Sequence, residues 1–116
     1  MFTRMLFGAI ALVSMPAAAA EPSAARGREL YNTVGCAQCH GTEGQGSNAG
    51  LKLAPDPLPA EAIAQFIRAT NTTMPPYSEA VLPDADVADI AAFLATIPAS
   101  RPVERIPLLN ALKPGR

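Results

Sequence analysis

The sequence contains few of the residues that build common metal and nucleic-acid sites. Its 116 residues include one histidine, two cysteines and no tryptophan. A structural zinc site takes four ligands, and the cysteines and the histidine supply only three before a carboxylate has to be used. The sequence also lacks a basic stripe on the expected folded body, so we expect no nucleic-acid partner.

Long hydrophobic runs are also missing. The most apolar stretch, residues 6–15, is only ten residues long, whereas a membrane-spanning helix needs about 20. Arg4 precedes this stretch, and Ala18 and Ala20 follow it at the positions of an A-x-A cleavage site. Residues 1–20 are therefore predicted to be a cleaved secretory signal peptide. We expect the mature protein in the periplasm, without a membrane span.

Charge divides the rest of the chain into two parts. Residues 21–98 hold nine acidic and four basic residues, a net charge of −5. Residues 99–116 hold four basic residues and one acidic residue, a net charge of +3, together with three prolines and four large aliphatic side chains. The length predicts one domain, which we place at 21–98, followed by a basic tail at 99–116. The tail is either a frayed terminus or a segment that docks on a partner.

Three segments have the apolar spacing of amphipathic helices, and none alternates with the period of a strand. We predict helices at about residues 23–34, 59–70 and 84–97, with Ser23 as an N-cap, Pro59 in a first turn and Pro98 ending the last helix. The fold class is therefore all-α. The expected apolar stripes are Gly27, Leu30, Tyr31 and Val34; Ile63, Phe66, Ile67 and Thr70; and Val87, Ile90, Ala91, Leu94 and Ile97.

The chemistry is concentrated in residues 36–40, which read Cys-Ala-Gln-Cys-His. Two thiols three positions apart can each add to one vinyl group of a haem, and the histidine that follows can reach the iron. C-x-x-C-H is for this reason typical of c-type haem attachment. A disulfide between Cys36 and Cys39 would leave His40 unexplained, and a thioredoxin-like redox pair needs strands that the pattern does not predict.

The second axial position of a haem iron needs a further donor. Met74 is the only methionine outside the predicted signal peptide, and it lies 34 residues after His40 in a loop followed by Pro75 and Pro76. A thioether opposite a histidine is a common axial pair that raises the reduction potential. We therefore predict that Met74 ligates the iron, with Lys52, Lys113 or an open site as the alternatives.

These motifs resemble those of class I c-type cytochromes of the short bacterial type. The similarity covers residues 23–97 and includes the Gly-Arg-Glu-Leu-Tyr segment at 27–31, the haem motif, and Met-Pro-Pro-Tyr at 74–77. The resemblance implies a cytochrome c fold of three or more helices around one covalent haem c. Cys36 and Cys39 would carry the thioether bonds, with His40 proximal and Met74 distal. It also implies that Gly27 lets the first and last helices approach closely, with Tyr31 against Ile90, Phe93 and Leu94.

The sequence departs from the family at two points. The Gly-Pro-x-Leu segment that often follows the haem motif is replaced by residues 48–55, so we place the carbonyl that accepts the proximal histidine proton within residues 50–55. The last helix begins without the usual Ser or Thr cap, and Asp84 is predicted to replace it.

The expected function is electron transfer rather than catalysis. The protein would cycle between Fe(III) and Fe(II), either as a diffusible carrier or as the cytochrome subunit of a dehydrogenase. Its partners would be redox proteins, a dehydrogenase or an oxidase. A haem enzyme or gas sensor is the alternative, but it requires an open distal position, which Met74 argues against.

Overall fold

The computed structural model describes residues 20–112, and all the regular structure in this range is helical. The helices are α1 (Ala24–Thr33), α2 (Cys36–His40), α3 (Ala60–Ala69), α4 (Asp84–Ala95), the 3₁₀ turn η1 (Val103–Arg105) and α5 (Pro107–Ala111). This confirms the all-α prediction. The predicted signal peptide lies outside the described residues, apart from Ala20.

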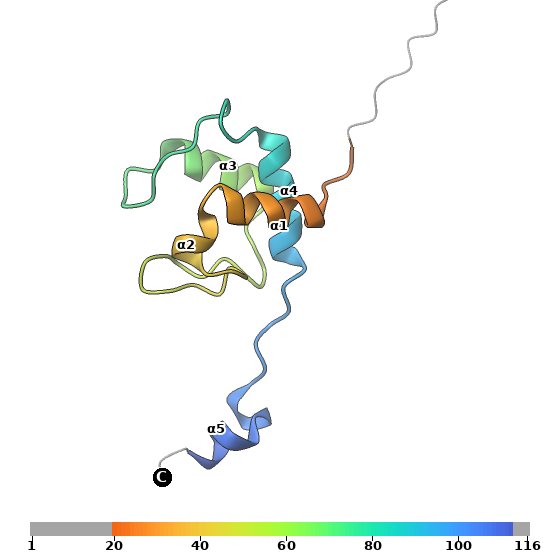
Figure 1. Cartoon of the computed structure of the whole chain (residues 1–116), viewed down its shortest axis with the longest axis vertical. Coiled ribbons are helices and arrows are strands. Elements are labelled where there is room, and N and C mark those ends of the chain that lie inside the picture. Colours follow the sequence, from red (N-terminus) through yellow and green to blue (C-terminus); the bar gives the residue numbers. More distant parts are fainter. Residues whose placement is uncertain (1–19, 113–116) are drawn as a thin grey trace, which may run out of the picture.

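The body of the molecule is organised around α4. Both α1 and α3 pack on α4, and α2 follows α1 directly, on the side of the long loop that leads to α3 (Figure 1). The buried core lies between these helices and includes Tyr31, Leu82, Val87 and Leu94, each at most 2% exposed.

The crossing of α1 over α4 depends on Gly27. A Cβ atom at this position would overlap the main-chain carbonyl of Asp89 and lie 2.8 Å from the backbone nitrogen of Ile90. One turn further along α1, the rings of Tyr31 and Phe93 meet with their centroids 5.5 Å apart. The expected contact of Gly27 and Tyr31 with the last helix is therefore confirmed.

The start of α1 is fastened to α4 by a buried carboxylate. Asp89 is 7% exposed, and its Oδ1 accepts a hydrogen bond of 2.6 Å from the backbone N–H of Ser23. Its Oδ2 accepts one of 2.7 Å from the guanidinium of Arg26, which also pairs with Asp86 at 2.7 Å. The hydrogen bond from Ser23, helped by Arg26, holds the pKa of Asp89 below its ordinary value. Sequence periodicity did not identify this buried acid, because a carboxylate breaks the apolar stripe.

We expect Asp89→Asn to destabilise the protein at pH 7 by about 1–3 kcal/mol, the cost of weakening a buried charged hydrogen-bond pair. Because the pKa of Asp89 is lowered on folding, its contribution is complete above the ordinary value of 3.8 and is lost as the pH falls below it. Urea unfolding between pH 7 and pH 3 should therefore show a shallower acid loss in the variant than in the wild type. Glu29→Gln, on the exposed face of α1, is the control, and equal acid slopes for all three proteins would contradict the prediction.

Two helix starts differ from the sequence expectation. Pro59 is the N-cap of α3 rather than a residue of its first turn. Asp84 does not cap α4: Pro83 occupies the N-cap position, and Asp84, the first helical residue, pairs instead with Arg68 at 2.7 Å. The prediction for Asp84 was wrong because a distant arginine competes for the carboxylate.

The predicted apolar stripes are partly buried. Ile67 is in the core, but Phe66 is 53% exposed and Thr70 is the C-cap of α3. In α4 the predicted Val87, Ile90 and Leu94 are buried and Ala91 is half-buried. The helix ends at Ala95, two residues earlier than predicted, so the half-buried Ile97 lies beyond it.

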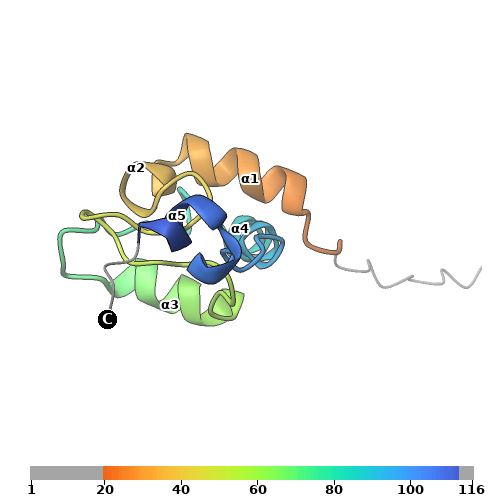
Figure 2. The same cartoon turned by 90° about the horizontal axis from the view of Figure 1, so that it is seen from below.

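The tail leaves the end of α4 and runs away from the other helices (Figure 1), and Figure 2 shows the same tail seen from below. Within residues 20–112, η1 and α5 contact each other but none of the helices α1–α4. Leu108 and Leu112 are 72% and 70% exposed. The sequence pattern did not indicate these two short helices. None of the helices in the described range is long and apolar enough to cross a bilayer.

Candidate functional site

The Cys-Ala-Gln-Cys-His motif forms the whole of α2, a five-residue helix. Residues three apart share a helix face, so Cys36 and Cys39 lie one above the other. Cys36 is half-buried and Cys39 is exposed, and the two thiols are free rather than joined in a disulfide. The C-terminal carbonyls of this helix are bound by the following loop, since Ser47 Oγ donates to Cys39 O at 2.6 Å and Gly46 N–H donates to His40 O at 2.8 Å.

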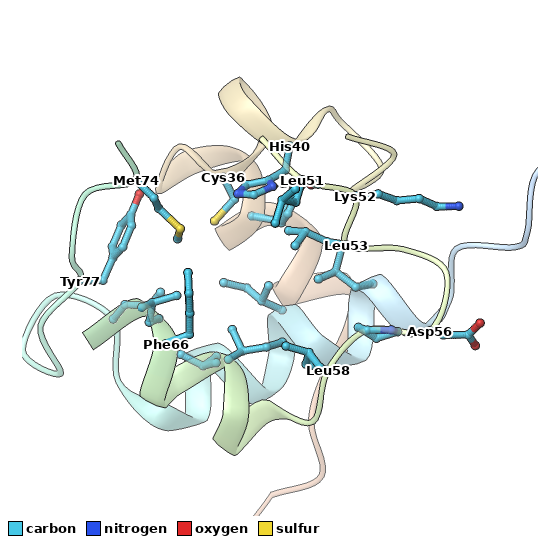
Figure 3. Close-up of a pocket in the computed structure, with 18 residues that line it drawn as sticks. Cys36, His40, Leu51, Lys52, Leu53, Asp56, Leu58, Phe66, Met74 and Tyr77 are labelled. Atoms are coloured by element: carbon cyan, nitrogen blue, oxygen red, sulfur yellow. Dashed lines mark hydrogen bonds between the residues drawn. The ribbon is translucent and has the colours of Figure 1, made fainter. Parts of the chain in front are cut away.

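A cavity of about 400 Å³ lies beside α2, between this helix, α3 and α4. The motif contributes Cys36 and His40 to its wall, and the loop after α3 contributes Met74 (Figure 3). In Figure 3 the sulfur atoms of Cys36 and Met74 point into the cavity. Most of the remaining wall is aliphatic or aromatic and includes Leu51, Leu53, Leu58, Ile63, Phe66, Ile67, Leu82, Val87, Ile90 and Leu94.

The orientation of His40 is set by a backbone carbonyl. Its Nδ1 lies 2.7 Å from the oxygen of Leu51, and since a carbonyl can only accept, Nδ1 carries the proton and donates. In this tautomer Nε2 bears the lone pair, which is the form in which an imidazole nitrogen binds a metal. Leu51 falls inside the segment 50–55 predicted to hold this acceptor, so that expectation is confirmed.

The approach of the Leu51 carbonyl to His40 requires the glycine before it. A Cβ at Gly50 would lie 2.6 Å from the main-chain oxygen of Cys39 and 2.9 Å from His40 Nδ1. Any side chain at position 50 would therefore push the loop off α2 and lengthen the hydrogen bond to the histidine.

A family model described as cytochrome c oxidase, cbb3-type, subunit III matches residues 22–94. The match covers more than half of the chain. The chain belongs to this family. Comparison with curated proteins and with solved structures gives no significant match. The protein is thus a c-type cytochrome domain with the all-α cytochrome c fold, and it transfers electrons through covalently bound haem c.

The site of the cytochrome domain has the chemical character that a haem needs. Its wall is apolar over nearly its whole extent, and its volume is within the range of about 300–1,000 Å³ for cofactor and ligand pockets. Nitrogen and thioether donors, both good ligands for haem iron, line the same cavity as the Cys36 thiol. Cys39 is absent from the cavity wall and lies one helical turn from Cys36, at the exposed surface.

Lys52, the alternative axial ligand, also lines the cavity of the cytochrome domain. Figure 3 shows its ammonium group pointing away from Cys36 and Met74. Lys113 lies outside the described residues. Of the candidate distal ligands in the described range, only the Met74 side chain points toward the centre of the cavity in Figure 3.

Two tyrosines of the cytochrome domain border the cavity and turn their hydroxyl groups toward main-chain carbonyls. Tyr31 donates to Gly41 O and Tyr77 donates to Val34 O, each at 2.8 Å. Burial, and secondarily the neighbouring Cys36, raises the pKa of Tyr31 to about 12 and also raises the pKa of Tyr77. Burial likewise raises the pKa of the Cys36 thiol. These tyrosines are therefore neutral donors at physiological pH.

Proposed function

We propose that this domain binds a single haem c through Cys36 and Cys39, with His40 and Met74 as the axial ligands, and relays electrons as part of an oxidase system. The observation that carries the proposal is that one apolar cavity is lined by Cys36, His40 and Met74, which come from two separate segments of the chain. A core methionine that only fills space has no need to share a cavity with the haem motif.

Each residue has a defined task in this proposal. Haem supplies the one-electron Fe(III)/Fe(II) couple. The carbonyl of Leu51 holds the proton on His40 Nδ1 and fixes the orientation of the ring, which keeps the lone pair of Nε2 available for the iron. The Met74 thioether favours the ferrous state and raises the potential. The aliphatic wall keeps water from the cofactor, which is a further determinant of potential.

The place of the domain in a redox chain is inferred from the family. The matching model describes a subunit of a cbb3-type oxidase, which favours an oxidase among the redox partners expected from the sequence. The predicted signal peptide supports a periplasmic location. We divide the mature chain into a haem domain at 21–98 and a basic tail at 99–116, and the lack of contacts between the tail helices and α1–α4 supports that division.

The proposed ligation is tested by replacing Met74. Met74→Ala should remove the weak near-infrared charge-transfer band of a thioether on ferric haem and open the iron to cyanide. Losing tenfold or more of the preference for the ferrous state lowers the potential by about 59 mV or more in a one-electron couple. Met74→Leu is the matched variant, because it keeps the volume and removes only the sulfur. An unchanged spectrum and potential in both variants would show that another group is the ligand.

The role of the tail is tested by deleting residues 101–116. Because the proposed haem ligands lie upstream and η1 and α5 do not touch α1–α4, the spectrum and potential should change little. Electron delivery to a purified cbb3-type oxidase should slow severalfold if the leucines and basic groups form part of the interface. Arg101→Gln/Arg105→Gln and Leu108→Asn/Leu109→Asn separate charge from apolar contact. A truncated protein that does not fold, or one that transfers electrons as fast as the full chain, would contradict the prediction.

A further inference from the structure

The loop that carries Met74 spans residues 70–83, between α3 and α4, and it has no helix or strand of its own. A loop that has to present a side chain to a cofactor needs anchors elsewhere in the fold. Met74 supplies little anchoring itself, because its backbone N–H makes only a long hydrogen bond of 3.3 Å to Thr72 Oγ1.

Arg68, in the last turn of α3, binds the second half of this loop at two backbone carbonyls. Its Nη1 donates to the carbonyl of Tyr77 at 3.0 Å, and its Nη2 donates to the carbonyl of Leu82 at 2.8 Å. Nη2 also pairs with Asp84 at 2.7 Å, at the start of α4. The Arg68 side chain is only 23% exposed. One guanidinium therefore ties the loop to both of the helices that it connects.

Tyr77 is held at every polar group that it has. Its N–H donates to Ile67 O at 2.8 Å and its carbonyl accepts from Arg68. Its hydroxyl donates to Val34 O, 43 residues away, at the end of α1. This residue is thus a fixed point at the junction of α1 and α3, three positions after Met74.

Between the fixed point and Met74 stand only Pro75 and Pro76. A proline ring fixes φ of its own residue, and a proline also restricts the backbone of the residue before it. Met74 precedes Pro75, so its own backbone is restricted. A displacement of Tyr77 would therefore be carried along the two prolines to Met74 rather than absorbed within them.

We propose that Arg68 and Tyr77 are positioning residues that hold the Met74 thioether in the haem cavity and so set how easily an added ligand displaces it. The inference rests on the proposed ligation by Met74. The planar, two-nitrogen fork of arginine is what allows one side chain to bind two carbonyls and a carboxylate together. A lysine in its place has a single ammonium centre and cannot span the same three acceptors.

The experiment measures imidazole binding to the ferric holoprotein, because imidazole binds only when Met74 has left the iron. Arg68→Met should raise the apparent affinity for imidazole about tenfold, since weaker anchoring increases the fraction of molecules with the loop open. The thioether charge-transfer band should weaken in the same variant. Arg68→Lys should behave like Arg68→Met. Tyr77→Phe, which removes only the hydrogen bond to Val34, should raise the affinity by a smaller factor. Arg101→Met, in the exposed tail, is the control.

The outcomes separate this inference from the ligation on which it rests. If Met74→Ala leaves the wild-type spectrum unchanged, Met74 is not the ligand, and Arg68 and Tyr77 then have no ligand to position. If Met74→Ala removes the band but Arg68→Met binds imidazole no more tightly than Arg101→Met, Met74 is still the ligand. The positioning role of Arg68 is then overturned. Arg68→Met with lower resistance to urea but unchanged imidazole affinity also overturns it, because the role of Arg68 is then structural only. If Arg68→Lys binds imidazole as weakly as the wild type, a lysine can replace the arginine. The argument that the planar fork of Arg68 is needed to join three acceptors is then wrong.

Discussion

A Gly27→Ala variant is expected to lose much of its stability and to yield little folded holoprotein. The added Cβ would overlap the main-chain carbonyl of Asp89 and stand 2.8 Å from the nitrogen of Ile90. Both atoms belong to the backbone of α4, which cannot rotate away as a flexible side chain could. The two helices have to move apart, and the buried contact of Tyr31 with Phe93 opens with them.

Two effects of opposite sign meet in this substitution. Alanine is a better helix former than glycine by about 1 kcal/mol, which favours the variant. Overpacking at a tight contact costs about 1–3 kcal/mol, and more where the obstacle is backbone. We expect overpacking to win, with a net loss of about 2 kcal/mol or more, a large share of the stability of a small domain.

Urea unfolding of the holoprotein, together with the yield of haem-bound protein, measures the loss. Ala25→Gly, on the exposed face of the same helix, is the matched control and should cost about 1 kcal/mol from helix propensity alone. A Gly27→Ala protein as stable as the wild type would mean that the helices do not approach as closely as Gly27 indicates.

The parts of the fold that could be predicted from the sequence are those that depend on local pattern. The stripes of α1 and α4 repeat with the period of a helix, and Ser23 is the N-cap of α1 as expected, accepting from Arg26 N–H at 3.3 Å. The haem motif lies within five consecutive residues, so its members could be named without any knowledge of the tertiary fold.

The parts that could not be predicted depend on residues far apart in the chain. Asp84 is of a residue type that often caps helices, but its carboxylate pairs with Arg68, 16 positions earlier. The hydroxyl of Tyr77 finds its acceptor 43 residues away. Such partners are chosen by the packing of whole helices, which residue spacing does not encode. In the candidate site, the sequence restricted the acceptor for His40 to a segment, and only the fold identified Leu51.

The exposure of apolar side chains is another property that the sequence pattern does not predict. Phe66 satisfies the helical stripe of α3, yet it lies in the wall of the cavity and is 53% exposed. An apolar stripe predicts which side chains avoid water, and it cannot tell contact with another helix from contact with a cofactor. In this chain, one part of the α3 stripe, Ile67, packs in the core and another, Phe66, lines the site.

Removing the thioether at Cys39 is also expected to have a large effect, on the yield of haem-bound protein. In the wild type, haem should stay with the polypeptide after denaturation and acid–organic extraction, because two covalent bonds hold it. Cys39→Ala should lose most of its holoprotein, and the haem that remains should depend on Cys36 alone. The reason lies in α2: Cys39 directly precedes His40, so a bond at Cys39 also restrains the backbone that presents the imidazole.

The two cysteines differ in setting, and this difference sharpens the test. Cys36 lines the cavity, whereas Cys39 is exposed at the surface. Cys36→Ala removes a half-buried side chain as well as a thioether, so it mixes a packing loss with the loss of attachment. Cys39→Ala removes an exposed thiol and reports more directly on the covalent bond.

Gln38→Ala, exposed between the two cysteines, controls for any change to the helix itself and should keep wild-type holoprotein. The double variant Cys36→Ala/Cys39→Ala should release all of its haem into the organic phase. Haem released from the wild type under the same extraction would contradict attachment at these residues. If Cys39→Ala alone retains wild-type yield and spectrum, Cys36 and the axial ligands suffice to hold the group. The second thioether would then contribute little to the orientation of His40, which the Leu51 carbonyl would set on its own.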